Sequence, residues 1–348
     1  MRKLKFIDLF AGIGGMRIAL EQAGMKCVFS SDINKDCQDV YAANFGERPF
    51  GDIKDINPQN IPDFDVLCAG FPCQPFSISG HKKGFEDARG TLFFEILRIL
   101  EVKKPATVLL ENVKHLIHHN RGETLRIIMQ SLKDLGYKIS YKILNAKNFG
   151  SAQNRERLII VGHKDRRFNF YTLRRIPNRI IEDILENTDD FEYLKSEEYT
   201  LIEYPKRQAS GLIFAGYRNK KIRQNGIRPN TLHLSRVHKQ PNRIYSAQGT
   251  HPTLPSQESS GRFWILHNNK VRKLTIRECY RLQGFPDNFK LSKSQTQQYL
   301  QIGNSIYIPM FQEIGQAIID QLYGKNYKEE IYEQSYTNLR FPLQLSPR

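Results

Sequence analysis

Paired cysteines and long apolar runs are missing from this sequence. The five cysteines are an odd number, and none belongs to a Cys-x-x-Cys pair or to a cluster with histidine. This pattern indicates neither a disulfide framework nor a zinc site. No segment has the length and hydropathy of a membrane span, and the basic start of the chain is not followed by a signal-peptide cleavage pattern. We therefore expect a cytoplasmic protein with no membrane association and no metal.

Acidic side chains are missing from one long stretch. From Tyr204 to Gln257 there is no Asp or Glu, whereas residues 206–243 contain ten Lys or Arg, in a chain whose net charge is +16. A surface of this kind attracts polyanions, so we interpret the stretch as a nucleic-acid face. The alternative is a solvated basic surface that has no partner.

Apolar runs and helical periods alternate over residues 4–165, a pattern typical of an α/β fold with a mostly parallel sheet covered by helices. The predicted strands are residues 4–10, 26–31, 65–69, 106–111, 137–145 and 157–162, and the predicted helices are 15–23, 35–45, 91–101 and 123–135. From about residue 170 to about residue 270 the alternation fails, which indicates a second, smaller domain. Residues 308–322 then form an amphipathic helix pattern.

The run FIDLFAGIGG at residues 6–15 predicts a strand, a glycine-rich turn and a helix. Its glycine spacing differs from GxGxxG, which disfavours a nicotinamide dinucleotide. Asp32 follows the next predicted strand and could bind two ribose hydroxyls, or it could cap a helix. Asp52 would end a third element and could bind the amino group of an adenine, or it could belong to a turn. Together these features favour a cofactor that contains adenosine.

Cys73 lies in the run GFPCQPFS, between Pro72 and Pro75. Prolines on both sides fix the backbone and remove amide donors, which suits a rigid loop that presents one side chain. Cys73 is therefore our candidate nucleophile, although a cysteine can also be an inert small apolar residue.

Two further groups are expected at the same edge of the sheet. Glu111 ends a predicted strand, where a carboxylate could be catalytic or merely solvated. Gln153, Arg155 and Arg157 occupy alternate positions, so in an extended chain they would share one face. Surface arginines that enter a strand are the alternative.

These residues carry a family resemblance. The chain resembles the DNA (cytosine-5)-methyltransferases of bacterial restriction and modification systems. Its matching runs appear in the family's usual order: FIDLFAGIGG at 6, GDI at 51, GFPCQPFS at 70, DARGTLFFEILRIL at 87, ENV at 111, QNRERL at 153, RKLTIRECYRLQGFP at 272 and QIGNS at 301. The resemblance implies a Rossmann-like, S-adenosylmethionine-dependent catalytic domain at residues 1–170 and 293–325. It also implies a smaller, irregular, β-containing target-recognition domain with a hinge at 171–292, leaving 326–348 as a tail.

The resemblance further implies where S-adenosylmethionine binds. The expected residues are Phe10, Ala11, Gly12, Ile13 and Gly15 for the methionine part, Asp32 and Ile33 for the ribose, Asp52 and Ile53 for the adenine, and Pro72, Leu92, Asn304, Ser305 and Ile306 for the rest of the pocket. Asp32 departs from the family, which more often has glutamate there, and the shorter acid would weaken ribose binding.

The implied reaction begins with addition of the Cys73 thiolate to carbon 6 of a cytosine, which makes carbon 5 nucleophilic. Glu111, holding a proton, would contact ring nitrogen 3, while Arg157, helped by Arg155 and Gln153, would bind the base carbonyl and a phosphate. A stacked cytosine cannot be reached from both faces, so the base must be flipped out of duplex DNA. The candidate DNA-contacting residues are Arg236, Gln240, Arg243, Gln248, Thr253 and Leu254.

Two rival functions remain. The same family includes an RNA-directed branch that acts on tRNA, and a catalytically idle DNA-binding regulator could keep the fold. An adenine or exocyclic-amino methyltransferase is disfavoured because the Asp/Asn-Pro-Pro-aromatic signature is absent. We expect a monomer that is paired genetically with a cognate restriction endonuclease. The recognised DNA sequence and the identity of that nuclease do not follow from the chain.

Overall fold

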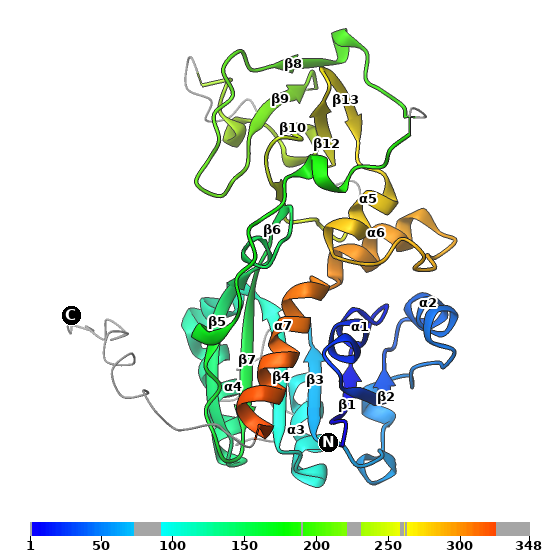
Figure 1. Ribbon diagram of the computed structural model, residues 1–348, viewed down its shortest axis with the longest axis vertical. Coiled ribbons are helices and arrows are strands. Elements are labelled where there is room, and N and C mark those ends of the chain that lie inside the picture. Colours follow the sequence, from blue (N-terminus) through cyan, green and yellow to red (C-terminus); the bar gives the residue numbers. More distant parts are fainter. Residues whose placement is uncertain are drawn as a thin grey trace, which may run out of the picture.

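The computed structural model describes residues 2–72, 92–188, 191–220, 231–257, 261 and 263–324. Most of their strands form two sheets, a larger one near the N-terminus and a smaller one at the other end of the molecule (Figure 1). Helices α5 (Ile276–Leu282) and α6 (Gln295–Asn304) lie between the two. The expected α/β fold with a separate β-containing part is confirmed.

The larger sheet has six strands in the order β2-β1-β3-β4-β7-β5. Their bounds are β1 Lys5–Leu9, β2 Lys26–Ser31, β3 Val66–Gly70, β4 Thr107–Val113, β5 Lys138–Asn145 and β7 Glu156–His163. The pairs β1·β2, β1·β3 and β3·β4 are parallel, whereas β7 runs antiparallel to both β4 and β5. The sheet is therefore mixed but mainly parallel, and β1, β3 and β4 end at one edge.

Helices cover both faces of this sheet, as the alternation of its buried residues requires. Phe6 and Leu109 face a core that includes helices α1 (Gly15–Gln22), α2 (Lys35–Phe45) and α7 (Ile308–Ile318). Ile7 and Leu110, each one residue further on, face a second core with α3 (Leu92–Lys103) and α4 (Glu123–Asp134).

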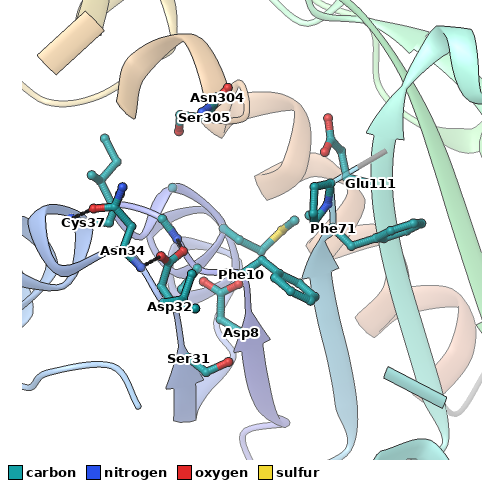
Figure 2. Close-up of a pocket in the computed structure, with 18 of the residues that line it drawn as sticks. Asp8, Phe10, Ser31, Asp32, Asn34, Cys37, Phe71, Glu111, Asn304 and Ser305 are labelled. Atoms are coloured by element: carbon teal, nitrogen blue, oxygen red, sulfur yellow. Dashed lines mark hydrogen bonds between the residues drawn. The ribbon is translucent and has the colours of Figure 1, made fainter. Parts of the chain in front are cut away.

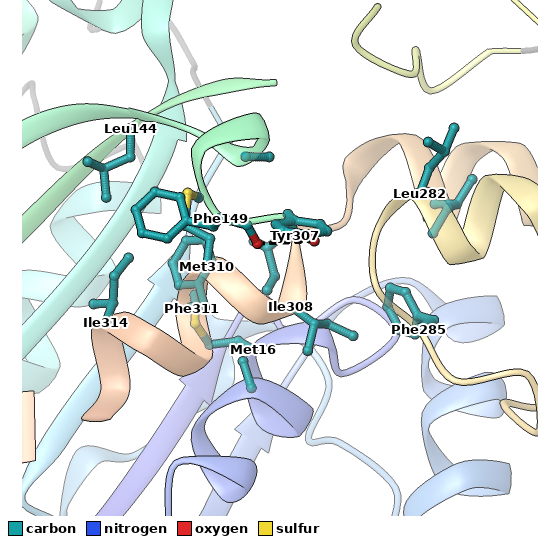
Figure 3. Close-up of a cluster of buried hydrophobic side chains, with 14 of the residues drawn as sticks. Met16, Leu144, Phe149, Leu282, Phe285, Tyr307, Ile308, Met310, Phe311 and Ile314 are labelled. Carbon is teal, nitrogen blue, oxygen red and sulfur yellow. Dashed lines mark hydrogen bonds between the residues drawn. The ribbon is translucent and has the colours of Figure 1, made fainter. Parts of the chain in front are cut away.

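Helix α7 carries the apolar stripe that the sequence predicts. Ile308, Phe311, Ile314 and Ile318 are all at most 2% exposed, and the helix ends in a π-helical turn, Ile319–Tyr323. Figure 3 shows Ile308, Phe311 and Ile314 in one cluster with Met16 of α1, Leu144 of β5 and Phe149, which follows β5. The same core continues to Leu282 and Phe285 near α5, and so connects the two parts of the molecule.

The smaller sheet has five short strands in the order β13-β12-β10-β9-β8. Their bounds are β8 Tyr199–Leu201, β9 Phe214–Arg218, β10 Arg243–Ser246, β12 Trp264–His267 and β13 Lys270–Lys273. A separate two-stranded pair joins β6 (Gln153–Asn154) to β11 (His251–Pro252) in parallel. Through this pair the chain of the smaller part returns beside the start of β7.

The segment at residues 51–53 differs from expectation. It does not end a strand: Phe50 makes only an isolated bridge to Ser31, and Asp52 then caps the short 3-10 helix Ile53–Asp55 by accepting a hydrogen bond from the Lys54 amide at 3.0 Å. Too few backbone pairs form at this edge of the sheet to make a strand, so the turn interpretation describes the local backbone correctly.

Candidate active site

A cavity of about 810 Å³ opens along the edge where β1, β3 and β4 end (Figure 2). All fourteen residues expected to bind the cofactor line it: Phe10, Ala11, Gly12, Ile13, Gly15, Asp32, Ile33, Asp52, Ile53, Pro72, Leu92, Asn304, Ser305 and Ile306. Glu111 and Arg157 line the same cavity. Segments far apart in the sequence therefore meet in one space.

The turn after β1 is shaped by unusual backbone angles and close approach. Phe10 has a φ of 57°, which is uncommon for an aromatic residue and is held here by the surrounding turn. A side chain on Gly15 would come within 2.8 Å of Ser305 Oγ, so only glycine lets the segment after α6 close over the turn.

Asp32 is held in place by backbone donors. Its Oδ2 accepts a hydrogen bond from the Gly12 amide at 2.7 Å, and its Oδ1 accepts one from the Asn34 amide at 2.8 Å. Burial raises the pKa of the carboxyl, while these two hydrogen bonds oppose that rise. Asp32 does not cap α2, because Asn34 is the capping residue. The carboxylate instead links the glycine turn to the end of β2.

Asp8 is a cavity residue that the sequence analysis missed. It lies in β1, is 1% exposed, and its Oδ2 has no hydrogen-bond partner in the described part of the chain. Burial and the neighbouring Asp32 raise the pKa of Asp8 to about 8. A carboxyl inside an otherwise apolar strand was the signal that could have identified it.

Glu111 and Arg157 form an ion pair inside the cavity. Arg157 Nε lies 2.8 Å from Glu111 Oε1, and each side chain is 12% exposed. The register explains the contact, because Arg157 is opposite Val113 on β4 and Glu111 is two residues away on the same face. Burial lowers the pKa of the Arg157 guanidinium, and the Glu111 charge opposes that effect.

The chain that leads to Cys73 enters beside Glu111. Gly70 at the end of β3 is paired with Glu111 in the register, and the Asn112 side-chain amide donates to the Phe71 carbonyl at 2.9 Å. Pro72 follows and lines the cavity. Cys73 itself lies outside the described residues, so its predicted role is not tested by the geometry.

Gln153 and Arg155 occupy places different from that of Arg157. Neither lines the cavity; Gln153 is fully buried, and Arg155 is 1% exposed. Gln153 Oε1 accepts from the Leu254 amide at 3.1 Å, and Arg155 Nη2 donates to the carbonyls of Gly303 and Ser305 at 3.0 and 2.5 Å. The predicted alternation therefore brings only Arg157 to Glu111.

Three of the six candidate DNA-contacting residues have exposed side chains, and the other three are partly or fully buried. Arg236, Gln240 and Gln248 are exposed, although the Gln248 side-chain amide donates to Glu182 Oε2 at 2.8 Å. In the remaining three, the Arg243 guanidinium donates to the His238 carbonyl, the Thr253 hydroxyl donates to the Asn154 carbonyl, and Leu254 is 1% exposed. Burial leaves the Leu254 side chain unavailable to a ligand on the surface.

The described residues contain neither a metal-binding cluster nor a membrane-spanning helix. No group of three His, Cys, Asp or Glu side chains among them is arranged to hold a metal ion. Within the same residues, no helix has the length and hydropathy needed to cross a membrane.

Comparison with known proteins identifies the family. The model of the C-5 cytosine-specific DNA methylases matches residues 4–320. The chain belongs to this family. It is 42% identical over 334 residues to the type II methyltransferase M.HhaI of Haemophilus parahaemolyticus, covering 93% of this chain and 97% of that protein. It is also 42% identical to the type II methyltransferase M.HpaII of Haemophilus parainfluenzae, covering 92% and 90% of the two chains.

Solved structures agree on the fold. The S. pombe Dnmt2 methyltransferase superposes with a TM-score of 0.65 at 20% identity, covering 92% of this chain and 99% of that one. The Entamoeba histolytica methyltransferase EhMeth superposes with a TM-score of 0.66 at 18% identity. The family resemblance noted from the sequence is confirmed, and the chain is a DNA (cytosine-5)-methyltransferase.

Proposed function

We propose that this methyltransferase transfers the methyl group of S-adenosylmethionine to carbon 5 of a cytosine flipped out of a specific duplex DNA sequence, through a covalent adduct with Cys73. The observation that carries the proposal is the single cavity lined by the glycine turn, by Asp32, and by the pair of Glu111 and Arg157. The cofactor residues and the catalytic residues thus adjoin one another.

The residues of the cavity fit an adenosyl cofactor. Ile33 is 69% exposed within the lining and offers an apolar surface to a purine, while Asp32 and Asp52 offer carboxylate acceptors to ribose hydroxyls and an amino group. Asn304 and Ser305 would close the pocket from the other side. The cofactor would supply an electrophilic methyl group.

The chain's own residues would then perform the base chemistry. The Cys73 thiolate would add to carbon 6, and the electron pair would move through the ring so that carbon 5 takes the methyl group, whose bond to the donor's sulfur breaks and leaves its electron pair on that sulfur. Glu111 would hold a proton against ring nitrogen 3, and Arg157 would donate hydrogen bonds to the carbonyl oxygen of the base. Loss of the proton from carbon 5 then expels the thiolate and restores the aromatic base. None of these steps requires a metal.

Glu111 must change partners for this mechanism to operate. In the free protein Glu111 Oε1 lies 2.8 Å from Arg157 Nε, so the carboxylate already has a partner in the cavity. A cytosine that enters between the two would offer its carbonyl to Arg157 and its ring nitrogen to Glu111. Base entry would thereby prepare the acid that the addition step needs.

DNA would bind in the region between the catalytic part and the smaller sheet. We propose residues 1–170 and 293–325 as the catalytic domain and 171–292 as the target-recognition domain and hinge. Of the candidate contacts, Arg236, Gln240 and Gln248 are exposed and remain our choices. Phosphate contacts from Lys and Arg would make binding strongly dependent on salt.

The biological setting follows from the chemistry proposed. Methylation of a short DNA sequence by a monomeric cytoplasmic enzyme would protect that sequence from a cognate endonuclease. The curated relatives are named as type II methyltransferases, which supports a pairing of this kind.

The Cys73→Ser variant tests the mechanism. We expect methyl transfer to duplex DNA to be abolished, because the serine hydroxyl is a far weaker nucleophile than a thiolate, while cofactor binding measured by calorimetry persists. Full activity in this variant would refute the mechanism.

Bisulfite sequencing of DNA from cells that express the wild type would identify the modified carbon and its sequence context. Methyl transfer to tRNA but not to DNA would overturn the choice of substrate. A wild type that binds DNA without transferring methyl groups to either nucleic acid would support the idle regulator.

A further inference from the structure

Three side chains at alternate positions reach three different parts of the molecule. Gln153 holds the amide of Leu254, on the segment that returns from the smaller sheet. Arg155 holds two carbonyls just after α6, and Arg157 holds the catalytic candidate Glu111. One short extended segment therefore joins the recognition part, the rim of the cofactor pocket and the catalytic carboxylate.

Arg155 is a costly residue at its position. Its side chain is 1% exposed, its Nε and Nη1 have no hydrogen-bond partner within the described residues, and no acidic side chain forms an ion pair with it there. Burial lowers the pKa of its guanidinium and the nearby charge of Arg157 acts in the same direction, whereas the charge of Glu111 only partly opposes them. An apolar side chain would avoid this cost. The role of the Arg155 guanidinium must therefore lie in the two hydrogen bonds that its Nη2 donates.

Those two contacts stabilise the end of a helix. Gly303 lies in the last turn of α6 and Ser305 is its C-cap, so their carbonyls are at the negative end of the helix dipole. An arginine that donates to the last carbonyls of a helix both satisfies them and complements the dipole. Asn304, between the two carbonyls, is exposed and lines the cofactor cavity (Figure 2).

The segment that Arg155 holds is tightly enclosed. On one side, a side chain at Gly15 would contact Ser305 Oγ at 2.8 Å. On the other side, a side chain at Gly303 would overlap the carbonyl of Pro255, on the segment returning from the smaller sheet. A small shift of residues 303–305 would therefore move one wall of the cofactor pocket.

We propose that Arg155 is a positioning residue that fixes residues 303–305 against the glycine turn and so sets the affinity for the methyl donor, while Gln153 separately fixes the segment that returns from the recognition sheet. This inference rests on the proposed function. It replaces, for these two residues, the expectation that they contact the cytosine or its phosphate. Arg157 alone remains in contact with Glu111 and faces the substrate cavity.

Arg155→Met and Arg155→Lys, with Gln153→Met as the matched control, test the assignment in the full-length chain. For Arg155→Met we expect the dissociation constant of S-adenosylmethionine, measured calorimetrically without DNA, to rise about tenfold, because one satisfied helix end is lost. Arg155→Lys retains the charge and can reach one carbonyl, so we expect an intermediate value. In steady-state methylation, KM for the cofactor should rise much more than kcat falls.

The control should lose affinity for DNA and keep its affinity for the cofactor. Gln153→Met loses the bond to the Leu254 amide, so we expect weaker binding to sonicated duplex DNA with an unchanged cofactor dissociation constant. For both Arg155 variants, the salt dependence of DNA binding should equal that of the wild type, because no phosphate contact is removed.

Three results would overturn the proposal. The first is an unchanged cofactor dissociation constant in Arg155→Met. The second is a salt slope lower by about one in that variant, which would show that Arg155 binds a phosphate. The third is an equal loss of cofactor and DNA affinity together with a lower Tm, which would indicate a general structural role. If Arg155→Met does not fold, Arg155→Lys is judged by the same criteria. A wild type that binds no cofactor would instead refute the proposed function.

Discussion

The two sheets of this protein differ in how they use their strands. In the six-stranded sheet the strands are five to eight residues long, the central ones are buried on both faces, and the parallel ones deliver Asp8, Gly70 and Glu111 to one edge. In the smaller sheet the strands are three to five residues long, and its long connections carry the basic residues. We expect the reaction chemistry to depend on the rigid edge of the large sheet, and the proposed recognition part to use loops that can vary without disturbing a core.

The largest effect is expected from removing the carboxylate at the edge of the large sheet. Glu111→Gln should lower the rate of methyl transfer by about 10² to 10⁴, because a positioned proton donor is lost. Cofactor binding should persist, since the expected cofactor contacts are made by other residues. Filter binding of labelled methyl groups and calorimetry would measure the two quantities.

Glu111→Gln also leaves Arg157 without its ionic partner, so stability must be measured in the same samples. Thermal denaturation serves as this control, because loss of one member of a buried ion pair can cost about 3 to 5 kcal/mol. A variant that keeps the wild-type rate would show that the edge of the large sheet does not supply the acid, and the contrast between the sheets would then fail.

Much of the large sheet could be predicted from the sequence. The bounds of β2 and α2 agree with the expected ranges, and those of β1, β3, β4, β5 and β7 differ from theirs by at most two residues at either end. Strands buried on both faces read as continuous apolar runs, and the helices between them have a clear period. This pattern places the glycine turn and Asp32 at one edge, whereas Pro72, Leu92 and residues 304–306 were expected there only from the family resemblance.

Less could be predicted where short elements meet. The two-residue pair of β6 and β11 has no period to detect, yet it decides what Gln153 contacts. The alternation of Gln153, Arg155 and Arg157 correctly indicates an extended segment, but it cannot show which distant segment packs against each side chain. Asp8 was missed because an apolar run was assigned to the core as a whole.

The second effect is a pH dependence of stability that arises from Asp8 in the large sheet. The pKa of Asp8 is raised from 3.8 to about 8, so in this range the folded protein keeps a proton that the unfolded chain releases. The free energy of unfolding should therefore fall as the pH rises from about 4 to about 8, by up to about 1.4 kcal/mol per pH unit from this group. Asp32 lies nearby and repels the ionised form, whereas Arg17 attracts it.

Asp8→Asn removes this titration with little change in shape. Urea unfolding at several pH values should show the variant gaining stability relative to the wild type between about pH 5 and about pH 8. If the free energy of unfolding depends on pH in the same way in both proteins, the pKa of Asp8 is not raised by folding. The edge of the large sheet would then not disfavour the ionised form of this carboxyl group.

The smallest effect concerns the charge of the smaller sheet. Arg236 lies in the stretch without acidic residues and is exposed, so Arg236→Gln should weaken binding to duplex DNA a few-fold and lower the salt slope by about one. Lys133→Gln is the matched control, because Lys133 is also exposed but belongs to α4, which packs with α3 on the large sheet. Fluorescence anisotropy with a labelled duplex at several salt concentrations would measure both slopes. Equal changes in the two variants would mean that the protein attracts DNA through its net charge as a whole, and that the acid-free stretch is no special nucleic-acid face.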